Sequence, residues 1–109
     1  MKSILFVCSA NKDRSKTAED YFSKQYPNLS FDAAGTNKKT CNKLGTNYLS
    51  KNQLDIADRI FVMENKHLEA IKEAFGSTYY NKITVLNIKD VYTYGSKELI
   101  EILTAKIIM

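Results

Sequence analysis

Residues 2–15 read KSILFVCSANKDRS, and this stretch decides the fold. Four consecutive apolar side chains at residues 4–7 are typical of a short parallel strand that is buried on both faces. A polar turn follows, and from Ser15 apolar side chains recur at helical spacing until Pro27 ends the pattern. The stretch therefore predicts a strand over residues 2–7, then a loop and a helix.

Three more strands are expected further along the chain. They are residues 29–34, which end at Gly35, and the compact apolar runs 60–63 and 83–86. The polar residues 36–42 are interpreted as a flexible loop, and residues 87–95 as a second loop. The strands are short and evenly distributed, which is typical of a chain that alternates strands with helices.

Three helices are expected between and after these strands. The first is suggested by Leu44, Tyr48 and Leu49; the second is striped by Leu68, Ile71 and Phe75 and ends at Gly76; the last opens at Ser96 and is striped by Leu99, Ile100, Leu103 and Ile107. Such alternation requires right-handed crossovers. The predicted fold class is α/β, a three-layer α/β/α sandwich with a four-stranded parallel sheet that binds ligands at the carboxyl ends of its strands.

Length and composition narrow the classes of function. At 109 residues, with 44% hydrophobic and 26% charged side chains, residues 1–109 are expected to form one globular domain. A net charge of +4 suits anionic substrates, but the lysines form no continuous stripe that would indicate nucleic-acid binding. We find neither a signal-peptide core nor an apolar run of membrane length, so we expect a cytoplasmic protein that binds no membrane. Its two cysteines, Cys8 and Cys41, are then expected to be free thiols that take part in a reaction rather than to form a disulfide.

The candidate chemistry lies in the loop between the first strand and the first helix. Its residues are Cys8, Ser9, Ala10, Asn11, Lys12, Asp13, Arg14 and Ser15. A loop of this length can curl so that its backbone N–H groups point inward, and the helix that follows offers the positive end of its dipole. Together they predict a cradle for an anion, to which Arg14 adds a bidentate grip on two phosphate oxygens.

Cys8 is the candidate nucleophile. Inward N–H groups, Arg14 and the helix dipole all favour its thiolate, which is the form that attacks phosphorus and makes a cysteinyl phosphate for water to hydrolyse. Ser15 is placed to donate a hydrogen bond to the sulfur, and Asn11 suits a left-handed turn position that braces the loop. A cysteine and an arginine at this spacing also occur by chance, and a buried strand-end cysteine is usually a small hydrophobe. The strand, loop and helix context favours the functional interpretation.

Asp90 is the candidate general acid. An alkoxide leaves poorly unless it is protonated, so this chemistry needs an acid on another loop at the same edge of the sheet. Asp90 follows the fourth strand and therefore lies at the correct end, and Tyr92 and Tyr94 are expected to line an aromatic substrate pocket beside it. The alternative is a solvated aspartate beside ordinary surface tyrosines.

At these residues the sequence resembles the low-molecular-weight protein tyrosine phosphatase family, and its length looks closest to a short bacterial branch of that family. Four stretches carry the resemblance: residues 4–8 with Asn11, Arg14-Ser15 and Ala18-Glu19; Ala33-Ala34-Gly35-Thr36; residues 57–63; and Asp90-Val91-Tyr92. The resemblance implies that Cys8 is the nucleophile, Arg14 the transition-state clamp and Asp90 the general acid. It also implies that Ser15 partners the thiolate, that Asn11 braces the loop, and that no cofactor is needed.

The sequence departs from the family pattern at two positions. Asp13 stands where many members carry a second cysteine, so no disulfide with Cys8 can form inside the loop. Its carboxylate would repel a phosphate dianion if it pointed inward. Val91 replaces the proline that would stiffen the acid loop.

Three functions follow from these residues. The first is a metal-independent protein tyrosine phosphatase that acts on phosphotyrosine proteins or on small aryl and alkyl phosphates. The second is a non-catalytic module that binds a phosphorylated protein, a nucleotide or an RNA end. The third and least favoured is a thiol-dependent arsenate reductase, for which only Cys41 is available as a further thiol. Cys41 itself is interpreted as a surface cysteine, and His67, the only histidine, as a surface or capping residue.

Overall fold

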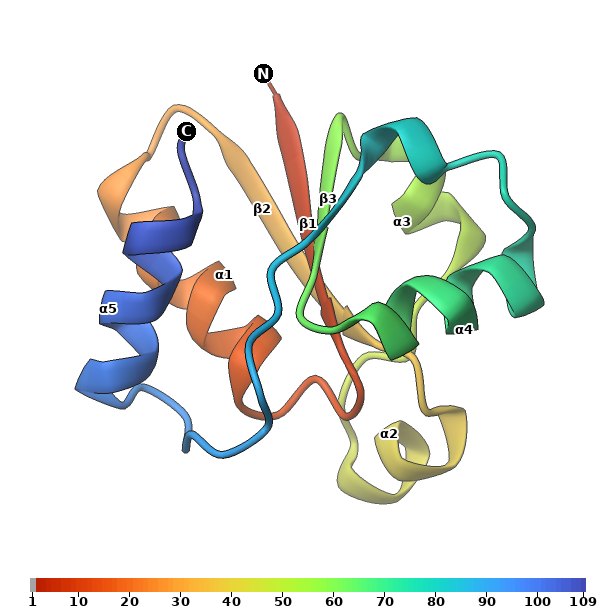
Figure 1. Ribbon diagram of the computed structural model, residues 1–109, viewed down its shortest axis with the longest axis horizontal. Helices are drawn as coiled ribbons and strands as arrows, with labels where there is room; N and C mark the ends of the chain where they lie inside the picture. Colours follow the sequence, from red (N-terminus) through yellow and green to blue (C-terminus); the bar gives the residue numbers. More distant parts are fainter. Residues whose placement is uncertain (1) are drawn as a thin grey trace.

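A four-stranded parallel sheet forms the centre of the computed structural model, which describes residues 2–109 (Figure 1). The elements in chain order are β1 (Ser3–Cys8), α1 (Arg14–Gln25), β2 (Ser30–Gly35), α2 (Lys38–Leu44), α3 (Lys51–Ile56), β3 (Arg59–Val62), α4 (Asn65–Phe75), a short 3₁₀ helix η1 (Tyr80–Lys82), β4 (Ile83–Val85) and α5 (Lys97–Lys106). The sheet order is β2-β1-β3-β4, and every pairing is parallel. The predicted fold class is confirmed, and each predicted strand lies within one residue of the observed one at both ends.

Helices cover both faces of the sheet. α1 and α5 lie on one side, and α3 and α4 lie on the other (Figure 1). Successive residues of β1 alternate between the two layers: Phe6 and Cys8 pack in the cluster under α1 and α5, whereas Leu5 and Val7 pack in the cluster on the opposite face. Burial on both faces is the physical reason for the continuous apolar run in β1, and it makes β1 a central strand.

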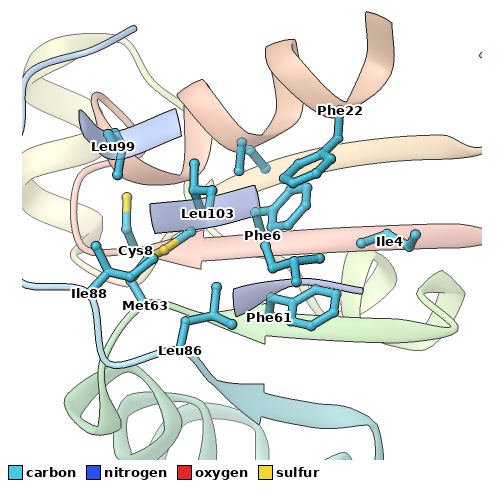
Figure 2. Close-up of a cluster of buried hydrophobic side chains, with 13 residues drawn as sticks. Ile4, Phe6, Cys8, Phe22, Phe61, Met63, Leu86, Ile88, Leu99 and Leu103 are labelled. Carbon is cyan, nitrogen blue, oxygen red and sulfur yellow. The ribbon is translucent and has the colours of Figure 1, made fainter. Parts of the chain in front are cut away.

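Aromatic rings fill the cluster under α1 and α5. Phe6 stacks on Phe22 and on Phe61, with ring centroids 5.7 and 5.8 Å apart. Cys8, Met63 and Ile88 stand together at one end of this cluster (Figure 2). The end of β1 is therefore fixed by close packing, which gives the loop after it a rigid base.

The connections place the carboxyl end of β1 at a topological switch point. From β1 the chain runs through α1 to β2 on one side, and it then returns through α2 and α3 to β3 on the other side of β1. Open parallel sheets bind ligands where the direction of strand order reverses in this way. Cys8 is the last residue of β1, so the loop that follows it occupies this point.

The predicted flexible loop at residues 36–42 is wrong, because most of these residues belong to α2. The side-chain oxygen of Asn37 accepts a hydrogen bond from the backbone N–H of Thr40 at 3.0 Å and so caps the helix start. Gly45, with a φ of 73°, ends the helix in the left-handed conformation. The polar composition of this segment reflects exposure of a short helix rather than lack of structure.

The helix predicted from Leu44, Tyr48 and Leu49 is also wrong. Leu44 ends α2 and is exposed, and Tyr48 lies in an extended segment that bridges to Gly35. The next helix, α3, begins only after Ser50, whose hydroxyl accepts from the backbone N–H of Gln53 at 3.2 Å. Within residues 2–109, no helix has the length and apolar character needed to cross a membrane.

Candidate functional site

The Cys8 loop, residues 8–15, joins β1 to α1 and is held from outside by residues 36–47. Three consecutive carbonyls of the loop accept hydrogen bonds from that segment. The carbonyl of Cys8 accepts from the backbone N–H of Thr36 at 2.9 Å, and that of Ser9 from the backbone N–H of Asn37 at 3.0 Å. The carbonyl of Ala10 accepts from the Thr46 hydroxyl at 2.6 Å. In a trans peptide the carbonyl and the next N–H point in opposite directions, so the N–H groups of the loop turn away from this outer segment. Within the described chain, the N–H groups of residues 10–13 donate to no protein acceptor. The loop thus has the form of the anion cradle that its length predicts.

The thiol of Cys8 has a defined partner. Its Sγ lies 3.0 Å from Oγ of Ser15, and this Oγ accepts a hydrogen bond from Nδ2 of Asn11 at 2.9 Å. Because Oγ of Ser15 is the acceptor in the bond from Asn11, its own O–H is available to donate to the sulfur. Asn11 has a φ of 53°, the left-handed conformation predicted for it, and its Oδ1 accepts from the backbone N–H of Asn47 at 3.2 Å. These contacts bring Cys8, Asn11 and Ser15 together as the sequence indicates.

Gly35, the last residue of β2, allows the Cys8 loop to approach the sheet. A Cβ atom at this position would lie 2.5 Å from the carbonyl oxygen of Ser9, 2.7 Å from Sγ of Cys41 and 2.9 Å from the backbone nitrogen of Asn11. Two of these atoms belong to the backbone of the loop, which cannot retreat without changing the cradle. Glycine at the end of β2 is therefore a requirement of the site.

We expect Gly35→Ala to destabilise the protein by about 1–3 kcal/mol, because the added methyl group overpacks the loop. It should also remove any activity that depends on the cradle. Gly45→Ala is the control: it meets open space but carries a φ of 73°, so it should cost about 1 kcal/mol and leave activity unchanged. Denaturant unfolding and phosphatase assays of both variants check this. Equal activity of the two variants would contradict the role of Gly35.

Arg14 is a buried cation whose guanidinium is fixed on one edge. Its Nη1 donates to Oε2 of Glu64 at 2.6 Å and to the carbonyl oxygen of Ile88 at 2.7 Å, and its side chain is 2% exposed. Its Nε lies 3.7 Å from Oδ1 of Asp90, and among the described residues Nη2 has no protein acceptor. The edge formed by Nε and Nη2 therefore remains for the bidentate contact that guanidinium groups make with phosphate.

A cavity of about 230 Å³ opens over Cys8. It is lined by Cys8, Ala10, Lys12, Asp13, Arg14 and Asp90. The structure thus brings the proposed nucleophile, clamp and general acid to one cavity, with the Asp90 side chain 58% exposed at its mouth. Lys12 is exposed there as well, and it adds positive charge at the rim.

The carboxylate of Asp13 makes a contact outside the cradle. Its Oδ1 accepts a hydrogen bond from the backbone N–H of Tyr94 at 2.9 Å, which ties the loop after β4 to the start of α1. This carboxylate therefore has a structural contact that the sequence pattern did not reveal. The repulsion considered for an inward-pointing Asp13 is reduced accordingly.

The structure does not place Tyr92 or Tyr94 in the lining of the cavity over Cys8, where the sequence predicts an aromatic substrate pocket. Tyr92 packs against the hydrophobic cluster under α1 and α5, and the Tyr94 hydroxyl bonds to the carboxylate of Asp20 on α1. Together with the Asp13 contact, these interactions hold the two tyrosines along α1, and neither side chain lines the cavity over Cys8. The cavity consequently has no aromatic lining.

Sequence reasoning missed Glu64 and misplaced His67 and Cys41. His67 is 1% exposed, and it accepts a hydrogen bond at Nδ1 from the backbone N–H of Glu64 at 3.0 Å, so the capping role is confirmed and the surface position is wrong. Cys41 is fully buried, with Sγ 3.8 Å from the carbonyl oxygen of Ser9. The signal for Glu64 was its position two residues after the end of β3, at the carboxyl edge of the sheet. Among residues 2–109, no group of three or more His, Cys, Asp or Glu side chains is arranged to hold a metal ion.

The ionisation of this cluster depends on its partners. Burial lowers the pKa of His67 from 6.5 to about 4; Arg14 and Lys66 also lower it, while Glu64 and Asp90 oppose the shift. The hydrogen bond from Arg14 lowers the pKa of Glu64. Near neutral pH the site therefore contains a neutral His67 and an ionised Glu64.

We expect the stability contributed by neutral His67 to be complete above pH 6.5 and to be lost as pH falls toward 4, because only the unfolded state binds a proton readily in that window. The loss amounts to about 3 kcal/mol. His67→Asn removes this titration, so the gap in free energy of unfolding between the protein and the variant should narrow as pH falls. Denaturant unfolding at several pH values checks this, and a gap that stays constant would contradict it.

Solved structures with the same architecture align with nearly the whole chain. Wzb from Vibrio vulnificus, in complex with benzylphosphonate, has a TM-score of 0.74 and 20% identity, covering 94% of this chain and 90% of the other. A low-molecular-weight phosphotyrosine phosphatase from Vibrio cholerae O395 has a TM-score of 0.68 and 19% identity, with coverage of 95% and 88%. The YwlE arginine phosphatase from Geobacillus stearothermophilus has a TM-score of 0.64 and 24% identity, with coverage of 97% and 83%.

At these identities the likeness establishes the fold. No protein-family model matches the chain, and no curated protein matches it in sequence. The chain has the fold of low-molecular-weight protein tyrosine phosphatases, as the resemblance at its nucleophile loop implied.

Proposed function

We propose that residues 1–109 form a single phosphatase domain that hydrolyses phosphomonoesters without a metal, through a cysteinyl-phosphate intermediate on Cys8. The observation that carries the proposal is the cavity that Cys8 shares with Arg14 and Asp90, beside a loop in which the N–H groups of residues 10–13 donate to no acceptor among residues 2–109. Thiolate, cation, acid and oriented N–H groups are the parts that a covalent phosphoryl transfer requires.

In the first step the Cys8 thiolate attacks phosphorus, so that an S–P bond forms while the bond between phosphorus and the leaving oxygen breaks. Arg14 and the N–H groups of the loop stabilise the equatorial oxygens. Asp90, at the mouth of the cavity, gives its proton to the leaving oxygen. Ser15, at 3.0 Å, stabilises the sulfur as an anion.

In the second step water attacks the phosphorus of the intermediate. Asp90, now a carboxylate, takes a proton from this water, the S–P bond breaks, and the Cys8 thiolate and inorganic phosphate are released. The same N–H groups and Arg14 serve both steps, because the equatorial oxygens keep their places.

We expect Asp90→Asn to lower kcat for phenyl phosphate by about 10²–10⁴-fold, because this leaving group needs a proton. Hydrolysis of p-nitrophenyl phosphate should fall much less in its first step, since nitrophenolate leaves unprotonated. Asp58→Asn is the control, because Asp58 accepts a hydrogen bond from Ser3 at the start of β1, at the other end of the strand from Cys8. An equal loss in the first step for both leaving groups would show that Asp90 is not the acid.

Phosphotyrosine proteins or small aryl and alkyl phosphates are the proposed substrates. A second candidate is phosphoarginine, because one neighbour is an arginine phosphatase and the cavity has two carboxylates, Asp13 and Asp90, but no aromatic lining. Carboxylates near the leaving group would favour a guanidinium over a phenyl ring. Rates on matched peptides with phosphotyrosine and phosphoarginine distinguish the two.

The alternatives are not favoured. A module that only binds phosphate does not need a thiol, a buried arginine and an acid in one cavity. Arsenate reduction would require Cys41 to leave its buried position behind the loop. Both cysteines are free thiols, and a reaction that depends on a thiolate suits a reducing compartment such as the cytoplasm.

A further inference from the structure

His67 joins the two parts of the site that must hold phosphate. Both ring nitrogens are engaged: Nδ1 accepts from the backbone N–H of Glu64 at 3.0 Å, and Nε2 lies 2.9 Å from Oγ of Ser9. Since Nδ1 is an acceptor, the proton of the neutral ring is on Nε2, which donates to Ser9. The ring is 1% exposed, so water does not replace either bond.

The Ser9 end of this link lies in the cradle. Ser9 directly follows Cys8, and its carbonyl accepts from the N–H of Asn37 at 3.0 Å. His67 therefore holds the side chain of Ser9, while Asn37 holds the carbonyl of Ser9 from the other side. With both contacts in place, the peptide after Ser9 has one orientation, and this orientation aims the N–H of Ala10.

The Glu64 end of the link leads to the clamp. The carboxylate of Glu64 is the 2.6 Å partner of Arg14, and the backbone of Glu64 is held by His67. The ring thus spans from the first turn of the Cys8 loop to the residue that orients the guanidinium. Small displacements of such groups cost much in transition-state stabilisation, because the reacting geometry tolerates little error.

We propose that His67 is a positioning residue that keeps the Cys8 loop and the Arg14 clamp in register for one phosphoryl group. The proposal rests on the proposed function, since it names a residue that serves the same site. His67 touches neither the cavity nor the reacting atoms, and it acts through Ser9 and Glu64.

The test uses His67→Asn, Ser9→Ala and the double variant. Asparagine can still accept from the N–H of Glu64 through Oδ1, but it is too short to reach Ser9, so the helix cap is kept and the link is cut. Each single variant is expected to lower kcat/KM by about 10- to 100-fold. The double variant should lose no more than either single one, because both remove the same bond. Ser9→Thr, which retains a hydroxyl, should recover most of the activity of Ser9→Ala.

A second measurement is the affinity for inorganic phosphate by calorimetry, which does not depend on turnover. Both single variants should bind phosphate more weakly, and Ser50→Ala, which removes the hydroxyl cap of α3, should bind it normally. If the unaltered protein binds phosphate without hydrolysing esters, the proposed function fails, while the phosphate affinities of the variants still decide the role of His67. Additive effects, or unchanged kcat/KM and phosphate affinity in Ser9→Ala, would overturn the proposal. Should His67→Asn fail to fold, Ser9→Ala and Ser9→Thr decide it alone.

Discussion

Replacing Cys8 by serine is expected to lower kcat for aryl phosphates by about four orders of magnitude or more, since removal of a covalent nucleophile has effects of this size. A serine hydroxyl at this position has no base beside it: its neighbour, Ser15, is a donor at 3.0 Å. The cradle and Arg14 remain, so inorganic phosphate should still bind. Steady-state kinetics with a chelator present, together with calorimetry of phosphate binding, measure the two properties separately.

Cys41→Ser is the matched control for this substitution. Cys41 is the other free thiol, and it lies outside the cavity, against the carbonyl of Ser9. It should retain most of the activity. A loss in Cys41→Ser as large as that in Cys8→Ser would point to a reaction that uses both thiols, as in arsenate reduction.

Arg14→Lys is expected to lower kcat/KM by about 10²–10³-fold, by analogy with the loss of one oriented charge donor from a transition-state site. Lysine keeps the positive charge and can still pair with Glu64. It cannot present two parallel N–H groups to the phosphate, which is the contact that the Nε and Nη2 edge of Arg14 allows. Kinetics on phenyl phosphate and on p-nitrophenyl phosphate should show the same loss, because the clamp acts on phosphorus and not on the leaving group.

Arg59→Lys controls for the substitution itself. Arg59 donates to the carbonyl of Ile108 and lies over the ring of Phe61, and it does not line the cavity. Its replacement should leave kcat/KM unchanged. An Arg14→Lys variant with the rate of the unaltered protein would mean that charge alone, without bidentate geometry, suffices in this cavity.

The sheet could be predicted from the sequence because its strands are short apolar runs with clear ends. The apolar run at residues 4–7 directly indicates that β1 is buried on both faces. The helix at residues 38–44 could not be recognised in the same way, since a helix with one buried residue, Cys41, has no apolar stripe. Its start depends on the cap from Asn37, a signal that is weak in a polar segment.

The site could be predicted where the residues lie close together in the chain. Cys8, Asn11 and Ser15 interact within one loop, so their spacing reveals the contact. Two other contacts join residues that are far apart in sequence: Asp13 with Tyr94, and Ser9 with His67. These pairs follow only from how the loops meet at the edge of the sheet. The position of Tyr94 could not be predicted for this reason: its backbone N–H donates to Asp13 and its hydroxyl to Asp20.

Detection of the cysteinyl phosphate tests the central claim most directly. Asp90→Asn should slow the hydrolytic step, which needs a base, more than the first step with p-nitrophenyl phosphate, which needs no acid. A rapid-mixing experiment with this variant should show a burst of nitrophenolate stoichiometric with the protein. Mass spectrometry after a denaturing quench at neutral pH should locate the phosphoryl group on Cys8. Turnover of the unaltered protein with no burst in the variant, or a phosphoryl group on any other residue, would contradict the account.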